Sequence, residues 1–396
     1  MMLFMPCHAG HKIAPAKRVS LMRHIRNAYP EQLTNPEKKM RKTFSQFGYN
    51  LYEFPLPIFP ITKFIRPDKF GQQSYGVPNR RKEKNGALYT CRGGFIDFSH
   101  MRAAADWTVY LAFKILSDKD NVDLPQEAGI LKLHFSHAEE LNEEDIVNMA
   151  QKIAFERLVW HEVASWHYHA PYHFISEQSS AFTPEDLYSN FLGTEIGKRI
   201  ALRILNKREP LSYSQIATEE IQKMITSLSP VQSKKDSKHA YDVVDLNKQR
   251  KLPRKEQNKD VWYDSKIVFH DQRYVFKRYM NTGPEIGPWL IPEPEKAGCP
   301  CEQDPEVLHV PQSASTGKSY YDYYTFTITP DSNMFYDYKR HKELHPAFSA
   351  FTTNHFGQIV RHIHQQMEGV LLPGFDKRND QNPTIFYTNA KKVFLK

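Results

Sequence analysis

Residues 143–169 read EEDIVNMAQKIAFERLVWHEVASWHYH, and this stretch predicts one long amphipathic helix. At about 100° per residue, one face of that helix is apolar and carries Ile146, Ala150, Ile153, Ala154 and Leu158. Arg157 and His161 lie on the same face, one turn apart, so both are predicted to be buried. A buried cation or imidazole is costly without a polar partner. Other parts of the chain must therefore supply polar groups that face this helix.

Two polar stretches flank the helix and are the expected source of those groups. The first, residues 91–107, reads CRGGFIDFSHMRAAADW and enters a second helix, 99–116, which is apolar nearly all round and therefore central. The second, residues 177–193, reads EQSSAFTPEDLYSNFLG, and its Thr-Pro-Glu-Asp start predicts a third helix that ends near Leu205. His100 falls in the first turn of the second helix, where the positive end of the helix dipole favours a neutral imidazole.

The three stretches together define a candidate site. We select as catalytic residues His100, His161, Glu162, Glu177, Asp186 and Cys91, and as substrate-binding residues Arg92, Arg157, Ser180 and Asn190. A neutral imidazole can act as a general base or as a metal ligand, so His100 and His161 are also the candidate ligands of a divalent metal such as zinc. The carboxylates would act as acids or orienting groups, and Arg157 as an anion binder. We expect the side chains of His100, His161 and Asp186 to converge in one cluster.

Other interpretations of these residues stay open at the level of the sequence. The pair His161-Glu162 begins the metalloprotease pattern H-E-x-x-H, but Ser165 stands where the second histidine is required, so that pattern is excluded. His100 could equally be a core histidine that is hydrogen-bonded to Asp97 or Asp186. A polar cluster of this kind can also serve only to fix the helices of a non-catalytic interaction module.

Composition limits the class of protein. The 396 residues include 25 Phe and 21 Tyr, which indicates a packed globular protein. The net charge of +8 is concentrated in residues 17–42 and 234–259, where basic residues do not alternate with aromatic ones, so we expect no nucleic-acid partner. The expected partner is a small-molecule or protein substrate. No apolar run is long enough for a transmembrane segment, and the N-terminus lacks a signal-peptide pattern. We therefore expect a cytoplasmic protein, or one exported by a route that needs no such signal.

Cysteine usage does not predict a disulfide framework. The four cysteines are Cys7, Cys91, Cys299 and Cys301, and they are few and scattered. The C-x-C pair at 299–301 lies in a proline-rich loop and is expected to be two loop thiols. Cys91 could be a nucleophile with a neighbouring histidine as its base, although a buried cysteine is more often inert.

Changes in composition divide the chain into four parts. Residues 1–44 form a basic N-terminal extension, and residues 45–229 form a helical core that carries the candidate site. Residues 230–260 are charged and weakly periodic, which predicts a linker or mobile insertion. Residues 261–396 form a C-terminal α+β lobe that packs on the core. The predicted fold class is therefore mainly α with a minor β component, with central buried helices and a strand-containing C-terminal lobe.

Several motifs resemble a bacterial family that is known only as a domain of unknown function, DUF4056. They are RGGFID-x2-H-x5-DW from Arg92, HE-x3-W from His161 and SAF-x-PEDLYSN-x-LG from Ser180, with later blocks at 271–274 and 287–292. The resemblance covers roughly residues 45–370 and implies relatives without implying a reaction. Relatives often look like exported lipoproteins, whereas this chain shows no such leader.

The sequence thus predicts an enzyme of the hydrolase or group-transfer type, with metal dependence left open. The alternative is a non-catalytic interaction module, translocated or associated with the cell envelope, whose buried polar cluster is structural. The exposure of His161 discriminates between them, since a pocket that reaches it from solvent favours the enzyme.

Overall fold

The computed structural model describes most of the chain between residues 12 and 353. The described residues are 12–36, 64–77, 79, 82–117, 121–126, 129–167, 182–183, 185–206, 211–244, 283–291, 293–300, 304–330 and 351–353. Helices account for just over half of these residues, and the strands among them form three small antiparallel sheets. The prediction of a mainly α protein with a minor β component is confirmed.

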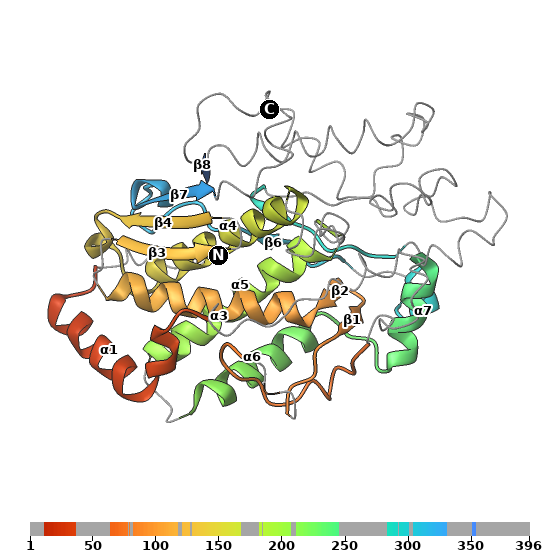
Figure 1. Ribbon diagram of the computed structural model, residues 1–396. Coiled ribbons are helices and arrows are strands. Elements are labelled where there is room, and N and C mark those ends of the chain that lie inside the picture. The colour runs from red at the N-terminus through yellow and green to blue at the C-terminus, as the bar shows by residue number, and fades with distance from the viewer. Residues whose placement is uncertain are drawn as a thin grey trace, which may run out of the picture.

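Three helices form the centre of the molecule: α3 (Phe98–Leu116), α4 (Glu143–His167) and α5 (Asp186–Leu205), and they lie side by side in Figure 1. Glycines allow α5 to approach α3 closely. A Cβ atom at Gly193 would lie 2.1 Å from the carbonyl oxygen of Met101, and one at Gly197 would lie 2.6 Å from that of Ala105. These two contacts advance together along both helices, so α3 and α5 run in the same direction. Their N-terminal ends therefore meet at one end of the core.

A short hairpin leads into that end of the core. Strand β1 (Ala87–Thr90) pairs with β2 (Gly94–Asp97) in antiparallel register, and α3 begins at the next residue. In the turn, Gly94 has a φ of 66°, and a Cβ there would lie 2.0 Å from the carbonyl oxygen of Trp289. Glycine is required at this position because it adopts a positive φ without strain and leaves room for the neighbouring chain.

A four-stranded antiparallel sheet packs beside the helices. Its strand order is β3 (Asn121–Gln126), β4 (Gly129–Phe135), β7 (Tyr324–Pro330) and β8 (Phe351–Thr352). A short 3-10 helix, η3 (Ala138–Glu140), connects β4 to α4. The pairing of β4 with β7 joins residues about 200 apart in the sequence, so the C-terminal strands complete a sheet that the core begins.

The N-terminal segment is part of the core and not only an extension. Residues 15–33 form α1 (Pro15–Ala28) and the 3-10 helix η1 (Pro30–Leu33). Leu21 and Ile25 of α1 are buried, and the Arg18 guanidinium donates hydrogen bonds to the carbonyl oxygens of Ile115 and Leu116 at the end of α3. Arg18 thus satisfies carbonyl groups that the end of a helix leaves without partners.

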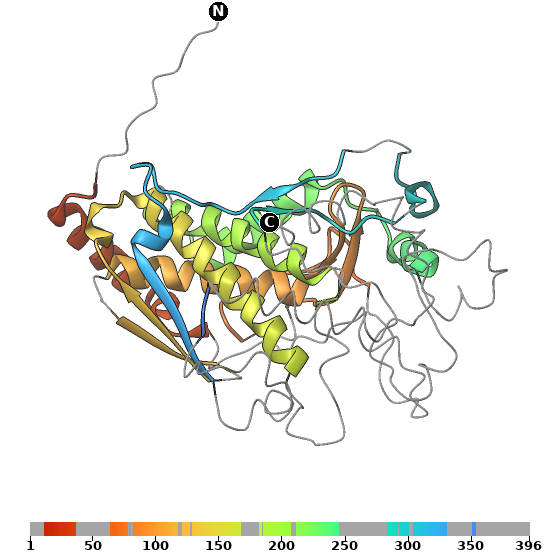
Figure 2. The ribbon, with the colours of Figure 1, turned by 90° about the horizontal axis from the view of Figure 1, so that it is seen from above.

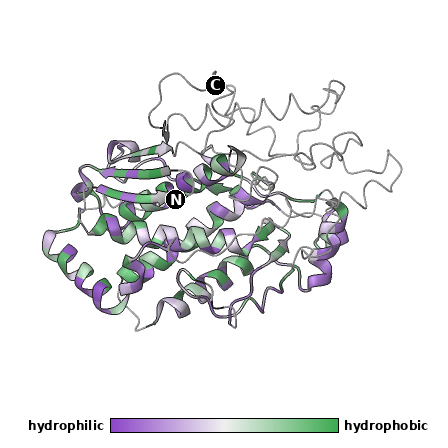
Figure 3. Cartoon of the chain, viewed as in Figure 1, coloured by the Kyte–Doolittle hydropathy of each residue, from purple (hydrophilic) through white to green (hydrophobic). Residues whose placement is uncertain are grey.

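The predicted linker also contains a packed helix. Helix α6 (Tyr213–Ser227) is followed by α7 (Lys234–Val244), which Figure 3 shows to be largely hydrophilic. Ala240 and Tyr241 of α7 are nevertheless buried, and the Ser237 hydroxyl accepts a hydrogen bond from the backbone N–H of Tyr89 in β1. Residues 234–244 of the segment predicted as a linker or mobile insertion therefore form a helix that packs against β1, and residues 245–260 lie outside the described part.

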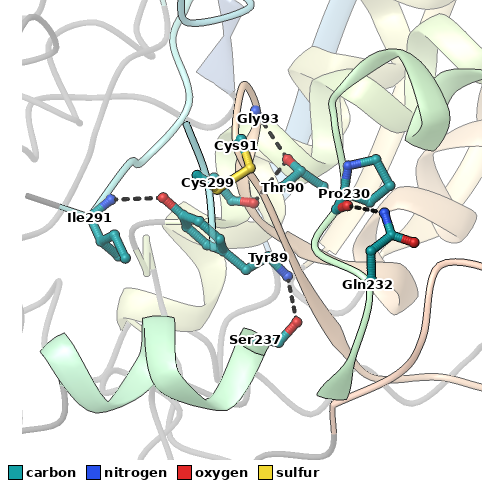
Figure 4. Close-up of a disulfide and its surroundings, with 10 residues drawn as sticks. Tyr89, Thr90, Cys91, Gly93, Pro230, Gln232, Ser237, Ile291 and Cys299 are labelled. Atoms are coloured by element: carbon teal, nitrogen blue, oxygen red, sulfur yellow. Dashed lines mark hydrogen bonds between the residues drawn. A yellow bond between two sulfur atoms is a disulfide. The ribbon is translucent and has the colours of Figure 1, made fainter. Parts of the chain in front are cut away.

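A C-terminal segment crosses the helical core, as Figure 2 shows. It contains β5 (Glu285–Ile286), η6 (Pro294–Ala297), β6 (Leu308–His309) and η7 (Tyr320–Asp322). A disulfide between Cys91 and Cys299 fastens this segment to the turn after β1 (Figure 4). The expectation of unpaired loop thiols is wrong for Cys299, because residues 208 apart in sequence are adjacent in the fold.

None of the helices among the described residues is long and apolar enough to cross a membrane.

Candidate functional site

The candidate site lies where the N-terminal ends of α3 and α5 meet the C-terminal half of α4. His100 comes from the first turn of α3, and His161 and Glu162 come from α4. Each of these three side chains places a nitrogen or oxygen atom within 4.8 Å of those of the other two, and the two imidazole centroids are 6.5 Å apart. Asp186, the first residue of α5, places Oδ1 3.2 Å from Nδ1 of His100. The predicted convergence of His100, His161 and Asp186 is confirmed.

Two aspartates face Nδ1 of His100. Asp97 caps α3, since its Oδ1 accepts hydrogen bonds from the backbone N–H groups of Ser99 and His100, and its Oδ2 lies 3.5 Å from Nδ1. Asp186 is held by Thr183, whose backbone N–H and hydroxyl donate to Oδ2 at 2.8 and 2.6 Å. Oδ1 of Asp186 is thereby directed at the imidazole. With Nδ1 between two carboxylates, Nε2 is the ring nitrogen that remains to reach α4.

Glu185 belongs to the cluster as well, which the sequence analysis missed. The Thr183 hydroxyl lies 3.0 Å from Oε1 of Glu185 and 2.6 Å from Oδ2 of Asp186. A hydroxyl has one proton and can donate to only one carboxylate at a time. Burial and the neighbouring charge of Asp186 raise the pKa of Glu185 well above its ordinary value. Glu185 is therefore the carboxyl group that carries a proton and satisfies the second contact.

The cluster has an excess of acidic groups. Four carboxyl side chains that are each no more than 2% exposed surround His100: Asp97, Glu162, Glu185 and Asp186. Burial opposes a charge on His100, but the carboxylates of Asp186, Asp97 and Glu162 outweigh it and raise the pKa of this imidazole to about 10. The expectation of a neutral His100 is wrong, because nearby full charges act more strongly than the partial charge of a helix end.

Several polar atoms of the cluster accept or donate no hydrogen bond within the described part of the chain. Glu162 accepts one from the backbone N–H of Phe182 through Oε2, at 2.8 Å, but Oε1 has no such partner. Asn190, one turn after Asp186 on α5, is fully buried, and both atoms of its amide lack partners. Oε2 of Glu185 also has no hydrogen-bond partner among the described residues. Buried atoms without partners cost free energy, so their accumulation at one place requires an explanation.

A second buried carboxylate on α4, Glu156, shows which partners an acidic residue has when it stabilises the fold. Glu156 lies 3.1 Å from the Lys152 ammonium and accepts hydrogen bonds from the hydroxyls of Tyr321 and Tyr324, each at 2.7 Å. Both of its oxygens are satisfied, and the group fastens η7 and β7 to α4. Glu162, two turns further along the same helix, has no comparable set of partners.

Arg157 and His161 occupy one face of α4, as the sequence predicts. The Arg157 guanidinium stacks on the indole of Trp107 in α3, 3.9 Å from the ring centroid. Burial lowers the pKa of Arg157 to about 9, so this residue remains a cation at neutral pH. His161 is half-buried, whereas His100 and Glu162 are buried. Solvent therefore reaches the cluster at His161.

Two of the residues predicted from the sequence have other roles. Cys91 is bonded to Cys299, and a disulfide has no thiolate that could act as a nucleophile, so the catalytic prediction for Cys91 is wrong in this state. The Arg92 guanidinium donates to the carbonyl oxygens of Ser227 and Asp304 and forms an ion pair with Glu306. Arg92 thus holds the C-terminal segment on the core and is not placed to bind a substrate in the cluster.

The remaining predicted residues, Glu177 and Ser180, lie outside the described residues, between the end of α4 and Phe182. Two members of the cluster, Asp97 and Glu185, were absent from the predicted set. In the sequence they stand at helix starts, where an acidic residue is ordinarily a cap. Asp97 is three residues before His100 and lies beside it through the local structure, whereas only the tertiary structure brings Glu185 to the same cluster.

Fold and site together define a helical protein with a buried cluster of histidine and carboxylate side chains at one end of a three-helix core. A family model described as "Protein of unknown function (DUF4056)" matches residues 31–292. This match covers more than half of the chain, so the chain belongs to the DUF4056 family. No curated protein and no solved structure matches it.

Proposed function

We propose that this protein is a hydrolase whose reaction takes place at the cluster of His100, His161 and Glu162. A hydrolase must activate a water molecule and stabilise charge that develops on the group under attack. Imidazole and carboxylate groups supply the first of these functions. Arg157, one turn before His161 on the same face of α4 and stacked on Trp107, is our candidate for the second.

The observation that carries the proposal is the contrast between two buried glutamates on α4. Glu156 has a lysine and two tyrosine hydroxyls as partners, as expected of a residue that stabilises the fold. Glu162 keeps one oxygen without a hydrogen-bond partner among the described residues, and a carboxylate oxygen of Glu162 lies within 4.8 Å of a ring nitrogen of each of two histidines. Unsatisfied polar groups in a folded protein concentrate where function requires them, since stability alone would remove them.

The accessibility of His161 supports an enzyme over a structural module. A purely structural cluster gains from complete burial and complete pairing, whereas a reacting group must meet its substrate. His161 is the half-buried member of the cluster, and the others are covered by it and by the three helices. The roles that follow are a water-activating function for His161 with Glu162, and a positioning function for Asp97 and Asp186, which hold His100.

The test combines an activity screen with unfolding measurements. Chromogenic carboxylic esters, phosphate esters, peptides and glycosides are assayed with the wild type, His161→Ala and a matched control, His134→Ala. His134 is an exposed histidine on β4 whose Nδ1 contacts Asn121. We expect a hydrolytic activity that His161→Ala abolishes and His134→Ala retains.

Unfolding measurements decide the matter where the screen contains no substrate of the enzyme. His161→Gln keeps the hydrogen-bonding capacity of the side chain, so at a functional position it should leave the unfolding midpoint close to that of the wild type. A loss of about 1–3 kcal/mol, the usual cost of disturbing a buried polar group, together with the absence of any activity, would instead identify the cluster as structural.

A further inference from the structure

We infer that His100, His161 and Glu162 together bind one divalent transition-metal ion, and that this ion is zinc. The inference deepens the proposed function, because it names the group that would activate water at the same site. Only the identity of the metal rests on the hydrolase proposal. Binding itself rests on the ligand geometry and on the unsatisfied oxygen of Glu162, and it can be measured without any substrate.

The three donor atoms are of the type and number that a catalytic zinc requires. Such sites use three protein ligands, commonly two histidines and one glutamate, and leave a fourth position for water. Zinc lies about 2.0–2.2 Å from nitrogen and oxygen ligands, so tetrahedral ligands are roughly 3.3–3.6 Å apart. The donor atoms of His100, His161 and Glu162 all lie within 4.8 Å of one another without an ion. A rotation of the half-buried His161 side chain can close the difference while α3 and α4 stay in place.

The surroundings of His100 match those of a metal-bound histidine. In metal sites the ring nitrogen that does not bind the metal usually donates to a carboxylate, which fixes the orientation of the ring. Here Nδ1 of His100 lies 3.2 Å from Oδ1 of Asp186 and 3.5 Å from Oδ2 of Asp97. Asp186 is in turn fixed by two hydrogen bonds from Thr183. Because Nδ1 faces these two carboxylates, we assign Nε2 of His100 to the metal.

A second and independent observation is the unsatisfied buried oxygen of Glu162. Glu162 is 2% exposed, one of its oxygens is held by the N–H of Phe182, and the other has no hydrogen-bond partner in the described part of the chain. A cation that binds Glu162 would satisfy this atom. It would also place a positive charge beside the buried side chains of Asp97 and Asp186.

The same donor set restricts the identity of the metal. Two nitrogens and one carboxylate oxygen are a poor match for magnesium or calcium, which prefer all-oxygen sites. Two histidines and a carboxylate also occur in non-haem ferrous enzymes that activate oxygen. Of the two metals, zinc is the one that serves hydrolysis. The experiment therefore distinguishes bound zinc from bound ferrous iron.

The experiment uses the full chain without a polyhistidine tag. Metal content is measured by elemental analysis after purification, and zinc affinity is measured by competition with a chromophoric chelator after the protein has been stripped of metal. The variants are His161→Ala, Glu162→Gln, Asp186→Asn and the control His134→Ala. A cobalt-substituted sample reports coordination through its visible absorption bands.

We expect one zinc per chain in the wild type and in His134→Ala, with visible cobalt bands of a tetrahedral site. His161→Ala and Glu162→Gln should weaken zinc binding by more than about 100-fold. Asp186→Asn, which affects only the orientation of His100, should weaken it by about 10–100-fold, the range for contacts one step removed from the metal. His161→Gln replaces His161→Ala if the alanine variant does not fold.

Three outcomes would overturn the inference or limit it. Equal zinc binding by the wild type and by His161→Ala and Glu162→Gln would show adventitious binding elsewhere and overturn the site. No metal at all, with activity still lost in His161→Ala, would overturn the metal and leave the hydrolase standing. Ferrous iron in place of zinc under anaerobic purification would confirm a metal site and overturn both zinc and the hydrolase proposal.

Discussion

Replacing Glu162 and Glu156 by glutamine in turn measures which of the two buried carboxylates holds the fold together. The two residues lie on the same helix and are both buried. The substitution is the same in each case and keeps the shape of the side chain. Any difference in stability therefore reports on the partners of each carboxylate, and not on helix propensity or side-chain volume.

The expected cost at Glu156 follows from its contacts. Glu156→Gln removes the charge that compensates the buried Lys152 ammonium and leaves one tyrosine hydroxyl facing an amide NH2 group. Removing one partner of a buried ion pair costs about 3–5 kcal/mol, because the other charge remains buried. We therefore expect Glu156→Gln to lower the free energy of unfolding by about that amount.

The expected cost at Glu162 is much smaller. The amide oxygen of glutamine can still accept the hydrogen bond from Phe182. The lost attraction to His100 is opposed by the relief of repulsion from the neighbouring carboxylates. Because these two effects have opposite signs, we expect the free energy of unfolding of metal-free Glu162→Gln to lie within about 1 kcal/mol of the wild-type value. A change of this size is usual for a substitution that removes no structural feature.

The assay is urea unfolding at pH 7 in the presence of a chelator, followed by tryptophan fluorescence, with the denaturant dependence compared between variants. Glu139→Gln is the surface control, since this side chain is 67% exposed, and it should match the wild type. Destabilisation by Glu162→Gln equal to that by Glu156→Gln would refute the reasoning. The cluster would then be a paired structural element, and the interaction module would become the better interpretation.

Three further predictions concern the same core. Gly193→Ala places a Cβ atom 2.1 Å from the Met101 carbonyl oxygen and should lower stability by about 1–3 kcal/mol or more; an unchanged thermal midpoint would mean that α5 can move away from α3. The double variant Cys91→Ser/Cys299→Ser should have a free energy of unfolding about 2–5 kcal/mol lower than that of the wild type. Peptide mapping of the wild type without reductant should recover the two cysteine peptides linked to each other. Free thiols at these positions would contradict the disulfide. Chelation should lower the thermal midpoint of the zinc-loaded wild type but not that of Glu162→Gln. A ligand present at about 100 times its Kd stabilises the folded protein by about 2.7 kcal/mol, and the variant lacks this contribution. Equal shifts in both proteins would place the metal elsewhere.

Much of the helical core could be predicted because its signals are local. The start at Asp97, the start at Thr183 and the apolar face from Ile146 each locate a helix within a few residues of its observed ends. The meeting of His100 with His161 was also predictable. Each is a polar residue on a face that must be buried, and two such faces can satisfy each other only by packing together.

The many charged residues of α7 obscure the sequence features that indicate a helix there. α7 is stabilised at its start by Ser233 and Asp236, which exchange hydrogen bonds between side chain and backbone, a capping box that the sequence displays. Among the residues of α7 whose burial is described, Ser237, Ala240 and Tyr241 are the buried ones, and this face is too narrow for a periodicity argument. The remaining stabilisation of α7 comes from its packing against β1, which is a tertiary contact.

The disulfide and the acidic excess of the site could not be predicted, for a common reason. Cys91 and Cys299 are far apart in the sequence, and pairing cannot be deduced from spacing. Asp97 and Glu185 each have a sufficient local role at a helix start. The predicted convergence of His100 and Asp186 implies that two helix starts meet, but the sequence does not show that Glu185 joins them, which depends on the close glycine contacts between α5 and α3.

The parallel arrangement of α3 and α5 also determines which ligand the cluster can accept. The positive ends of both helices face the cluster and support negative charge there, although burial and the charge of Glu162 raise the pKa of Asp186 to about 7. Glu162, in contrast, approaches from the C-terminal half of α4, where the helix dipole offers no such support. One oxygen of Glu162 accepts the backbone hydrogen bond of Phe182, and the other has no hydrogen-bond partner among the described residues. The cation proposed above would satisfy that oxygen and change the sign of the local field. A carbonyl or phosphoryl oxygen of a substrate would then be attracted to a site that otherwise repels it.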